Sequence, residues 1–180
     1  MADLEKAEGD IRSVIAELDE LMSREFRKTF DLVALEFREI FKRLFHGGSA
    51  RLLLTEETHP TESGIDIEAR LPGKRMQRLA LLSGGERAMT AVALIFALIK
   101  ASPTPFCVMD EVDAALDEAN IERLSEILTE LAEETQFVII THNRNTVQMA
   151  DLIYGITLGR DSTSQTISLR LEDVDERYTE

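Results

Sequence analysis

The sequence has 180 residues, of which 44% are apolar, and a formal net charge of −14. This length suits one globular domain with an appendage, and the single cysteine, Cys107, excludes an internal disulfide framework and is compatible with a reducing compartment. The longest apolar run, residues 88–99, is shorter than the roughly 20 residues of a membrane helix, and the first ten residues are too charged for a secretory signal. We therefore expect a cytoplasmic protein with no membrane partner.

The helix predicted at the start of the chain carries an apolar seam. Leu4, Ile11 and Leu18 recur every seven residues, and Ile15 and Met22 form a second series beside them. This spacing is typical of a coiled coil, and the pattern is already established at Leu4, so residues 1–25 are expected to be the end of a longer coiled coil. With only three heptads, a helix packed against its own domain remains the alternative.

From residue 26 the seam widens into a stripe with the spacing of a core-facing helix, which predicts that the globular body begins here and extends to residue 172. Gly47 and Gly48 are expected to end the helix. The residues of the stripe are Phe26, Phe30, Val33, Phe37, Phe41 and Leu44.

Two strands, residues 50–55 and 64–71, should follow as an antiparallel pair joined by the polar loop 56–63. Pro72 and Gly73 then predict a turn, and residues 74–81 lead into the sequence Leu-Ser-Gly-Gly-Glu-Arg at 82–87. A helix from residue 84 to about 101 is apolar nearly all round and is expected to be buried.

The Leu82–Arg87 stretch can be interpreted in two ways. Gly84 and Gly85 would let the backbone approach a ligand at the start of a helix, where free N–H groups suit a phosphate. Ser83 and Glu86 also fit a capping box, which many helices use without a ligand.

After Pro103 and Pro105 the predicted order is strand 106–109, a helix through Leu131, strand 137–140, a short helix 146–150 and strand 152–158. This alternation predicts an α/β fold with a mainly parallel sheet flanked by helices. A final hairpin should turn at 159–162 and return along 166–171, and the acidic tail, residues 173–180, is expected to fray.

Polar residues follow two of the predicted buried strands, at the sheet edge where parallel sheets hold their ligands. Asp110 could bind Mg²⁺ through water, and Glu111 could act as the base for a water molecule in line with a γ-phosphate. His142 could hydrogen-bond the phosphate or that water. A polar loop and a structural histidine are the alternatives. Asp117 would cap the following helix.

Together, these motifs resemble the C-terminal half of an ABC-type ATPase head, and within that superfamily the SMC (structural maintenance of chromosomes) proteins, nearest the prokaryotic condensin type. Asn143 after the switch histidine and the position of His46 before the two-glycine turn depart from the family pattern. The matching residues are the signature Leu82, Ser83, Gly84, Gly85 and Glu86, the Walker B aspartate Asp110 with Glu111, the D-loop Ala114, Ala115, Leu116 and Asp117, and the switch His142.

The resemblance implies an ATPase that uses ATP and Mg²⁺, acting in chromosome condensation and segregation at the nucleoid. The sequence contains no P-loop, G-x-x-x-x-G-K-[ST]; the nearest candidate, Gly73-Lys74, has Glu68 and Arg75 where a glycine and a Ser or Thr are needed. In this family the N-terminal half of the head carries the P-loop, so this chain alone is expected to be inactive. Asp110 and Glu111 would act in cis with that half, and the signature would act in trans on ATP held by a second head.

The resemblance further implies a kleisin subunit, whose C-terminal winged-helix domain binds this half of the head, and DNA. The basic residues lie mainly between residues 23 and 78, with 11 Lys and Arg against 9 Asp and Glu, although a solvated mixed-charge surface is the alternative for each. A related DNA-repair coiled-coil ATPase and a non-catalytic head scaffold are the alternative functions. The candidate DNA contacts are Arg24, Arg27, Lys28, Lys42, Arg43, Lys74 and Arg75.

Overall fold

The computed structural model describes residues 2–55, 63–159 and 163–170. The chain forms two compact units, Met1–Pro103 and Thr104–Glu180, and each is described by itself. The predicted tail, most of the loop 56–63 and most of the turn 159–162 lie outside the described residues.

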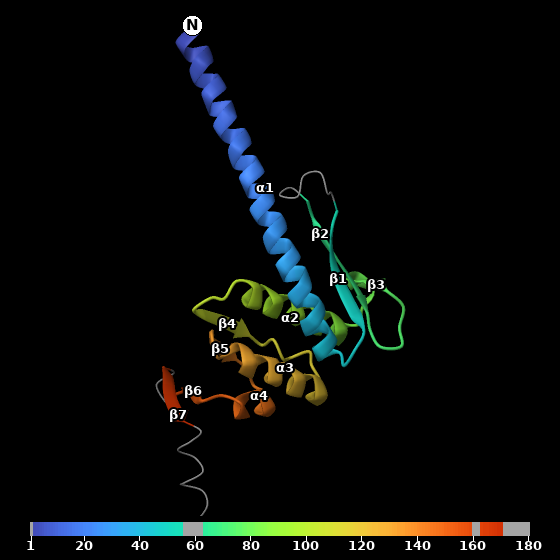
Figure 1. The fold of residues 1–180 in the computed structure, drawn as a ribbon. Helices are drawn as coiled ribbons and strands as arrows, with labels where there is room; N and C mark the ends of the chain where they lie inside the picture. The colour runs from blue at the N-terminus through green and yellow to red at the C-terminus, as the bar shows by residue number, and fades with distance from the viewer. Residues whose placement is uncertain (1, 56–62, 160–162, 171–180) are drawn as a thin grey trace, which may run out of the picture. The chain divides into compact units, whose positions relative to one another are not determined.

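The first unit is built on helix α1 (Ala2–Leu44), which runs without a break through residue 25 (Figure 1). The predicted seam residues Ile11, Ile15, Leu18 and Met22 are all exposed, and Val33 is the first buried residue among residues 6–44 of the helix. The predicted helix is confirmed, and Phe26 and Phe30, where the globular body was predicted to begin, are half-buried. That residues 1–25 form a coiled coil stays a prediction.

Helix α2 (Gly84–Ala101) packs beside the C-terminal part of α1, and Lys100 pairs with Glu36 across the two helices at 3.4 Å. The predicted burial of α2 is confirmed for most of its large apolar residues, whereas Ile95 and Leu98 are exposed. The largest side chains of this core with almost no exposed surface are Phe37, Ile40, Phe41, Leu44, Met89 and Phe96.

A three-stranded antiparallel sheet completes the first unit. Strand β1 (Ser49–Leu54) pairs with β2 (Ile65–Arg70), which pairs with the two-residue β3 (Gln77–Arg78). A short 3₁₀ helix, η1 (Leu79–Leu81), then leads into α2. The predicted hairpin is confirmed, whereas β3 and η1 were not predicted because two or three residues carry no periodic pattern.

The second unit contains a parallel pair, β4 (Phe106–Asp110) and β5 (Gln136–Ile140), connected through helix α3 (Glu118–Leu131). Helix α4 (Arg144–Gln148) begins two residues earlier than predicted. Strands β6 (Leu152–Leu158) and β7 (Ser164–Arg170) pair antiparallel in a separate sheet. The expectation that β6 continues the parallel sheet is therefore wrong for the described residues. The apolar run of β6 suited either sheet, and the short connection to β7 favours a hairpin.

Two glycines in turns, Gly48 before β1 and Gly73 after β2, allow the cost of a left-handed backbone to be separated from the cost of a steric clash. Gly48 has φ +77°, and a Cβ built on it would lie 2.3 Å from the carbonyl oxygen of Arg70, whereas Gly73 has φ +75° but open space around it. We expect Gly73→Ala to cost about 1–2 kcal/mol, which is the penalty of a left-handed backbone alone. Gly48→Ala should cost more, because the β1–β2 pair must also shift. Urea unfolding of both variants checks this, and equal losses of stability would contradict it.

Candidate functional site

The signature stretch forms a capped start of helix α2. Ser83 is the N-cap residue; its side chain accepts from the Glu86 N–H at 3.4 Å, and its own N–H donates to the Glu86 carboxylate at 3.0 Å. This is the predicted capping box. It supports the interpretation of residues 83–86 as a helix start and leaves the ligand interpretation as a prediction.

The Glu86 carboxylate has a second partner in the loop before β3. Lys74 Nζ donates to Glu86 Oε1 at 2.6 Å. This hydrogen bond lowers the pKa of Glu86 below its ordinary value, and the hydrogen bond from the Ser83 N–H adds to the effect. Lys74, a candidate DNA contact in the sequence, therefore also fixes the signature loop.

The residues in and next to the signature differ in how far they are buried in their own unit. Leu82 is buried, so it anchors the loop in its own unit, whereas the preceding Leu81 is 70% exposed. A Cβ added at Gly84 would have no atom within 4 Å, so packing within the chain does not demand glycine there. The fold does not need a glycine at position 84, but the absence of a side chain there lets another group come close to the backbone.

Strand β4 delivers Asp110 to the carboxyl edge of the parallel pair, next to Ile140 of β5. Its side chain is exposed. Within residues 2–55, 63–159 and 163–170, no three His, Cys, Asp or Glu side chains are grouped so that they could hold a metal ion. A single carboxylate at a sheet edge fits Mg²⁺ that keeps most of its water and is otherwise bound by phosphates.

Glu111 continues the ladder by one hydrogen bond and then turns sharply. Its N–H donates to the Ile140 carbonyl at 2.9 Å, and its φ is +47°, a left-handed conformation that is uncommon for a residue with a Cβ. The turn brings its carboxylate to His142, with 3.9 Å between Oε1 and Nδ1. The side chains are 62% and 78% exposed, so the structure unites the two predicted catalytic residues on an open surface.

Sequence reasoning missed a buried carboxylate two residues after Glu111 in the chain. Asp113 is 2% exposed, and its Oδ2 accepts from Thr141 Oγ1 at 2.6 Å and from Thr146 Oγ1. No periodic pattern marks Asp113. One local feature could have pointed to it: Thr141 and Thr146 lie on either side of His142, close enough along the chain for both hydroxyls to donate to one acceptor.

The D-loop connects this turn to helix α3. Asp117 is the N-cap of α3 and accepts from the Asn120 N–H at 2.8 Å, as predicted. Ala114 and Ala115 are exposed, and Leu116 is half-buried. The two alanines thus form a small exposed surface beside Glu111.

The candidate DNA contacts lie on two elements of the first unit. Arg24, next to Glu25 at 3.5 Å, is one of five on helix α1, and the other two precede β3. All seven residues are exposed. The residues on α1 are Arg24, Arg27, Lys28, Lys42 and Arg43; those before β3 are Lys74 and Arg75.

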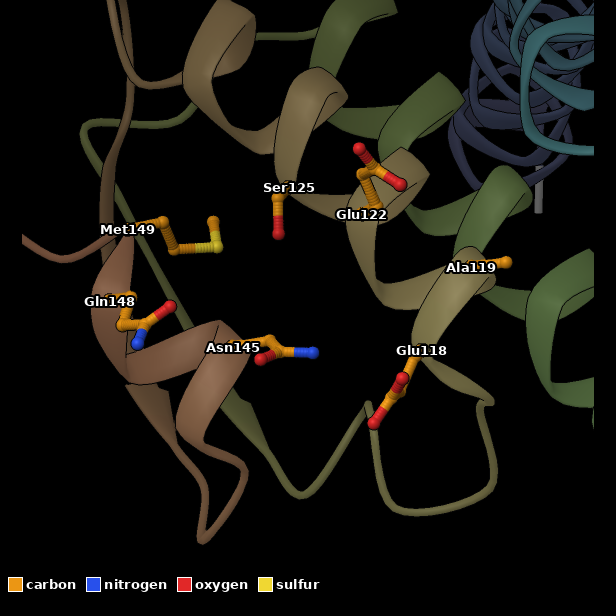
Figure 2. A pocket seen from close by; sticks show the side chains of 7 residues that line it. All are labelled: Glu118, Ala119, Glu122, Ser125, Asn145, Gln148 and Met149. Carbon is orange, nitrogen blue, oxygen red and sulfur yellow. The ribbon is translucent and has the colours of Figure 1, made fainter.

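An open groove of about 590 Å³ lies between α3 and α4. Figure 2 shows Ser125 and Met149 facing each other across it, with Glu118 and Glu122 of α3 along its rim. None of the predicted site residues lines it. Two carboxylates repel phosphate groups, so the groove does not suit a nucleotide.

A model of the RecF/RecN/SMC N terminal domain matches residues 11–165. The chain belongs to this family. It is 46% identical over 174 residues to the Chromosome partition protein Smc of Bacillus subtilis (strain 168), which covers 97% of this chain and 15% of that protein. The chain therefore spans only a small part of this SMC relative.

Solved structures agree with the family assignment. The Smc head domain of Pyrococcus furiosus, with an extended coiled coil and bound to the C-terminal domain of ScpA, has a TM-score of 0.83 and 39% identity, covering 97% of this chain and 44% of that one. A chain from structural work on ATP-driven dimerization and DNA stimulated activation of SMC ATPases has a TM-score of 0.75 and 40% identity, covering 86% of this chain and 93% of that one.

The similarities place the chain in the head region of prokaryotic SMC proteins. In the part of the chain that the structure describes, no helix is both long and apolar enough to span a membrane.

The Lys74–Glu86 contact predicts how the pKa of Glu86 changes when the lysine is replaced. Because the folded-state pKa of Glu86 is lowered, the interaction stabilises the fold at neutral pH and is lost as the pH falls through that pKa. In Lys74→Met we expect the pKa of Glu86 to move up toward the ordinary glutamate value of about 4.3. An NMR titration of the Glu86 carboxyl carbon measures this. Lys100→Met, which removes a cation elsewhere in the same unit, is the control and should leave the Glu86 pKa unchanged.

Proposed function

We propose that this chain is the C-terminal half of an SMC head, which completes a Mg-ATP site with the N-terminal half and supplies the signature motif to a second head. The observation that carries the proposal is the motif set: signature, Walker B, D-loop and switch histidine are present, and the P-loop sequence is absent. The description of the matching family model names an N-terminal domain. The motif set of this chain supports the opposite half.

The parallel pair supports the need for a second half. Phe106, Val108, Val138 and Ile140 line one face of β4 and β5 and are 47–60% exposed. Parallel sheets are normally covered on both faces, and exposed apolar surface of this kind marks an interface. We infer that the N-terminal half of the head covers this face and brings its P-loop to the edge where Asp110 and Glu111 lie.

In the completed head, Asp110 would hold Mg²⁺ through water, and the bound nucleotide would supply the phosphoanhydride that is cleaved. Glu111 would accept a proton from the attacking water at its carboxylate, because its backbone turn directs it away from Asp110 and toward His142. His142 would orient that water or the γ-phosphate through its imidazole.

The signature loop would act on ATP bound by the opposite head. The N–H groups of Gly84 and Gly85 belong to the first turn of the helix. N–H groups in a first turn have no hydrogen-bond partner within the helix, and this end of the helix carries the positive end of its dipole. The open space at Gly84 allows a close approach. ATP would then join two heads, and hydrolysis would separate them, driving chromosome condensation and segregation at the nucleoid.

A kleisin and DNA complete the proposal. The Pyrococcus furiosus relative binds the C-terminal domain of ScpA, and we propose that a corresponding winged-helix domain binds the β6–β7 hairpin here. Tyr154, Ile156 and Leu158 lie on one face of that hairpin and are exposed. DNA would contact the basic residues of α1 and the loop before β3.

The base assignment predicts the effect of Glu111→Gln. In a complete head made from this chain and the N-terminal half, ATP turnover should fall by roughly 10²-fold or more, because glutamine cannot take the proton. ATP-dependent pairing of heads should persist. Steady-state phosphate release and gel filtration measure the two effects, and Glu122→Gln, an exposed change on α3, is the matched control. Unchanged turnover in Glu111→Gln would refute the assignment.

The trans contact predicts a different phenotype for Ser83→Arg. The bulky cation at the N-cap should block ATP-dependent pairing of heads while ATP binding to each head remains. Loss of the cap should also cost about 1 kcal/mol of stability, so thermal unfolding is measured alongside. Ser102→Arg, at the other end of α2, is the control. A Ser83→Arg head that still pairs on ATP would rule out the trans role.

A further inference from the structure

We propose that Asp113 is a positioning residue that holds the Glu111 turn and the His142 loop in one arrangement, and thereby sets the geometry of hydrolysis. This inference rests on the proposed function. Its starting observation is that one oxygen of a buried carboxylate binds two hydroxyls that lie 28 and 33 residues further along the chain.

The two threonines hold both sides of the switch histidine. Thr141 directly precedes His142; its hydroxyl donates to Asp113 at 2.6 Å and its oxygen accepts from the Asn143 N–H at 2.9 Å. Thr146, which is buried, lies in helix α4 just beyond that loop. The loop that carries His142 is therefore attached to Asp113 at its start and at its end.

Asp113 belongs to the turn in which Glu111 has a strained backbone. A left-handed backbone costs a residue with a Cβ roughly 1–2 kcal/mol and persists only where the surroundings impose it. Hydrogen bonds inside the turn join Ala114 N–H to the Glu111 carbonyl at 3.1 Å and Leu116 N–H to the Asp113 carbonyl at 3.0 Å. Asp113 is the buried side chain of this turn, so it links the strained residue to the loop opposite.

The second oxygen of Asp113 indicates that the arrangement does not serve stability alone. Oδ1 is buried and has no hydrogen-bond partner among the described residues. A buried polar atom without a partner lowers stability. A carboxylate placed at such a cost in the turn of Glu111, and bonded to the loop of His142, is explained by the need to fix where these two exposed side chains, 3.9 Å apart, lie.

The test removes one hydroxyl at a site away from the reacting groups. In the complete head, Thr146→Val keeps the shape of the side chain but cannot donate to Asp113. We expect kcat for ATP hydrolysis to fall by roughly 10-fold to 100-fold, as small displacements of catalytic groups do, with KM for ATP and ATP-dependent pairing unchanged. Thr146→Ser, which restores the hydroxyl, should regain most of the rate.

Thr146→Ala is measured in parallel, with the same expectation, so that a folding defect specific to valine does not decide the result. Thermal unfolding shows that each variant is folded at the assay temperature. A Thr146→Val or Thr146→Ala head with normal kcat, or a Thr146→Ser head as slow as these two, would overturn the inference.

A double variant separates this inference from the proposed function. If Asp113 holds Glu111 and His142 in one arrangement, Thr146→Val should slow Glu111→Gln by much less than it slows the unmodified head, because one of the two groups that Asp113 positions is already lost. A full additional loss would contradict the inference. If Glu111→Gln alone leaves turnover unchanged, the proposed function fails; if Glu111→Gln slows turnover and Thr146→Val does not, only the positioning role fails.

Discussion

The parallel pairing of β4 with β5 determines the positions of the catalytic candidates in the second unit. Asp110 and Ile140 are partners in register, so the two strands leave the sheet side by side. The Glu111 N–H extends that ladder by one more bond before the chain turns. Because parallel strands have no tight turn to align them, this register depends on long-range contacts, and the separation of Glu111 from His142 depends on it in turn.

The helix cap at the signature stretch uses the N–H groups of only two of its residues. The capping box satisfies the N–H groups of Ser83 and Glu86, while the first-turn N–H groups of Gly84 and Gly85 lie between them in sequence. Lys74, which lies outside the capping box, donates to the Glu86 carboxylate and so restricts its movement. A rigid loop loses little entropy when a ligand binds, which would suit the proposed contact with a second head.

Local patterns made much of this fold predictable. Helical periodicity marked α1 and α3, a continuous apolar run marked α2, and residues with capping chemistry, Ser83 and Asp117, marked the starts of α2 and α3. Strand β3 was not predictable, because its two residues are defined only by pairing with β2. Asp113 was missed for a related reason, since its partners are distant in sequence and nothing local distinguishes a buried aspartate from one that begins a loop.

The exposure of the candidate site is itself informative about mechanism. Glu111 and His142 face water, where a carboxylate and an imidazole interact weakly because the surrounding dielectric constant is high. Catalysis by positioned charges and hydrogen bonds becomes strong only when water is excluded. The exposed apolar face of β4 and β5 lies on the same two strands. Covering that face is thus the step that would turn an ordered but solvated arrangement of side chains into a working ATPase site.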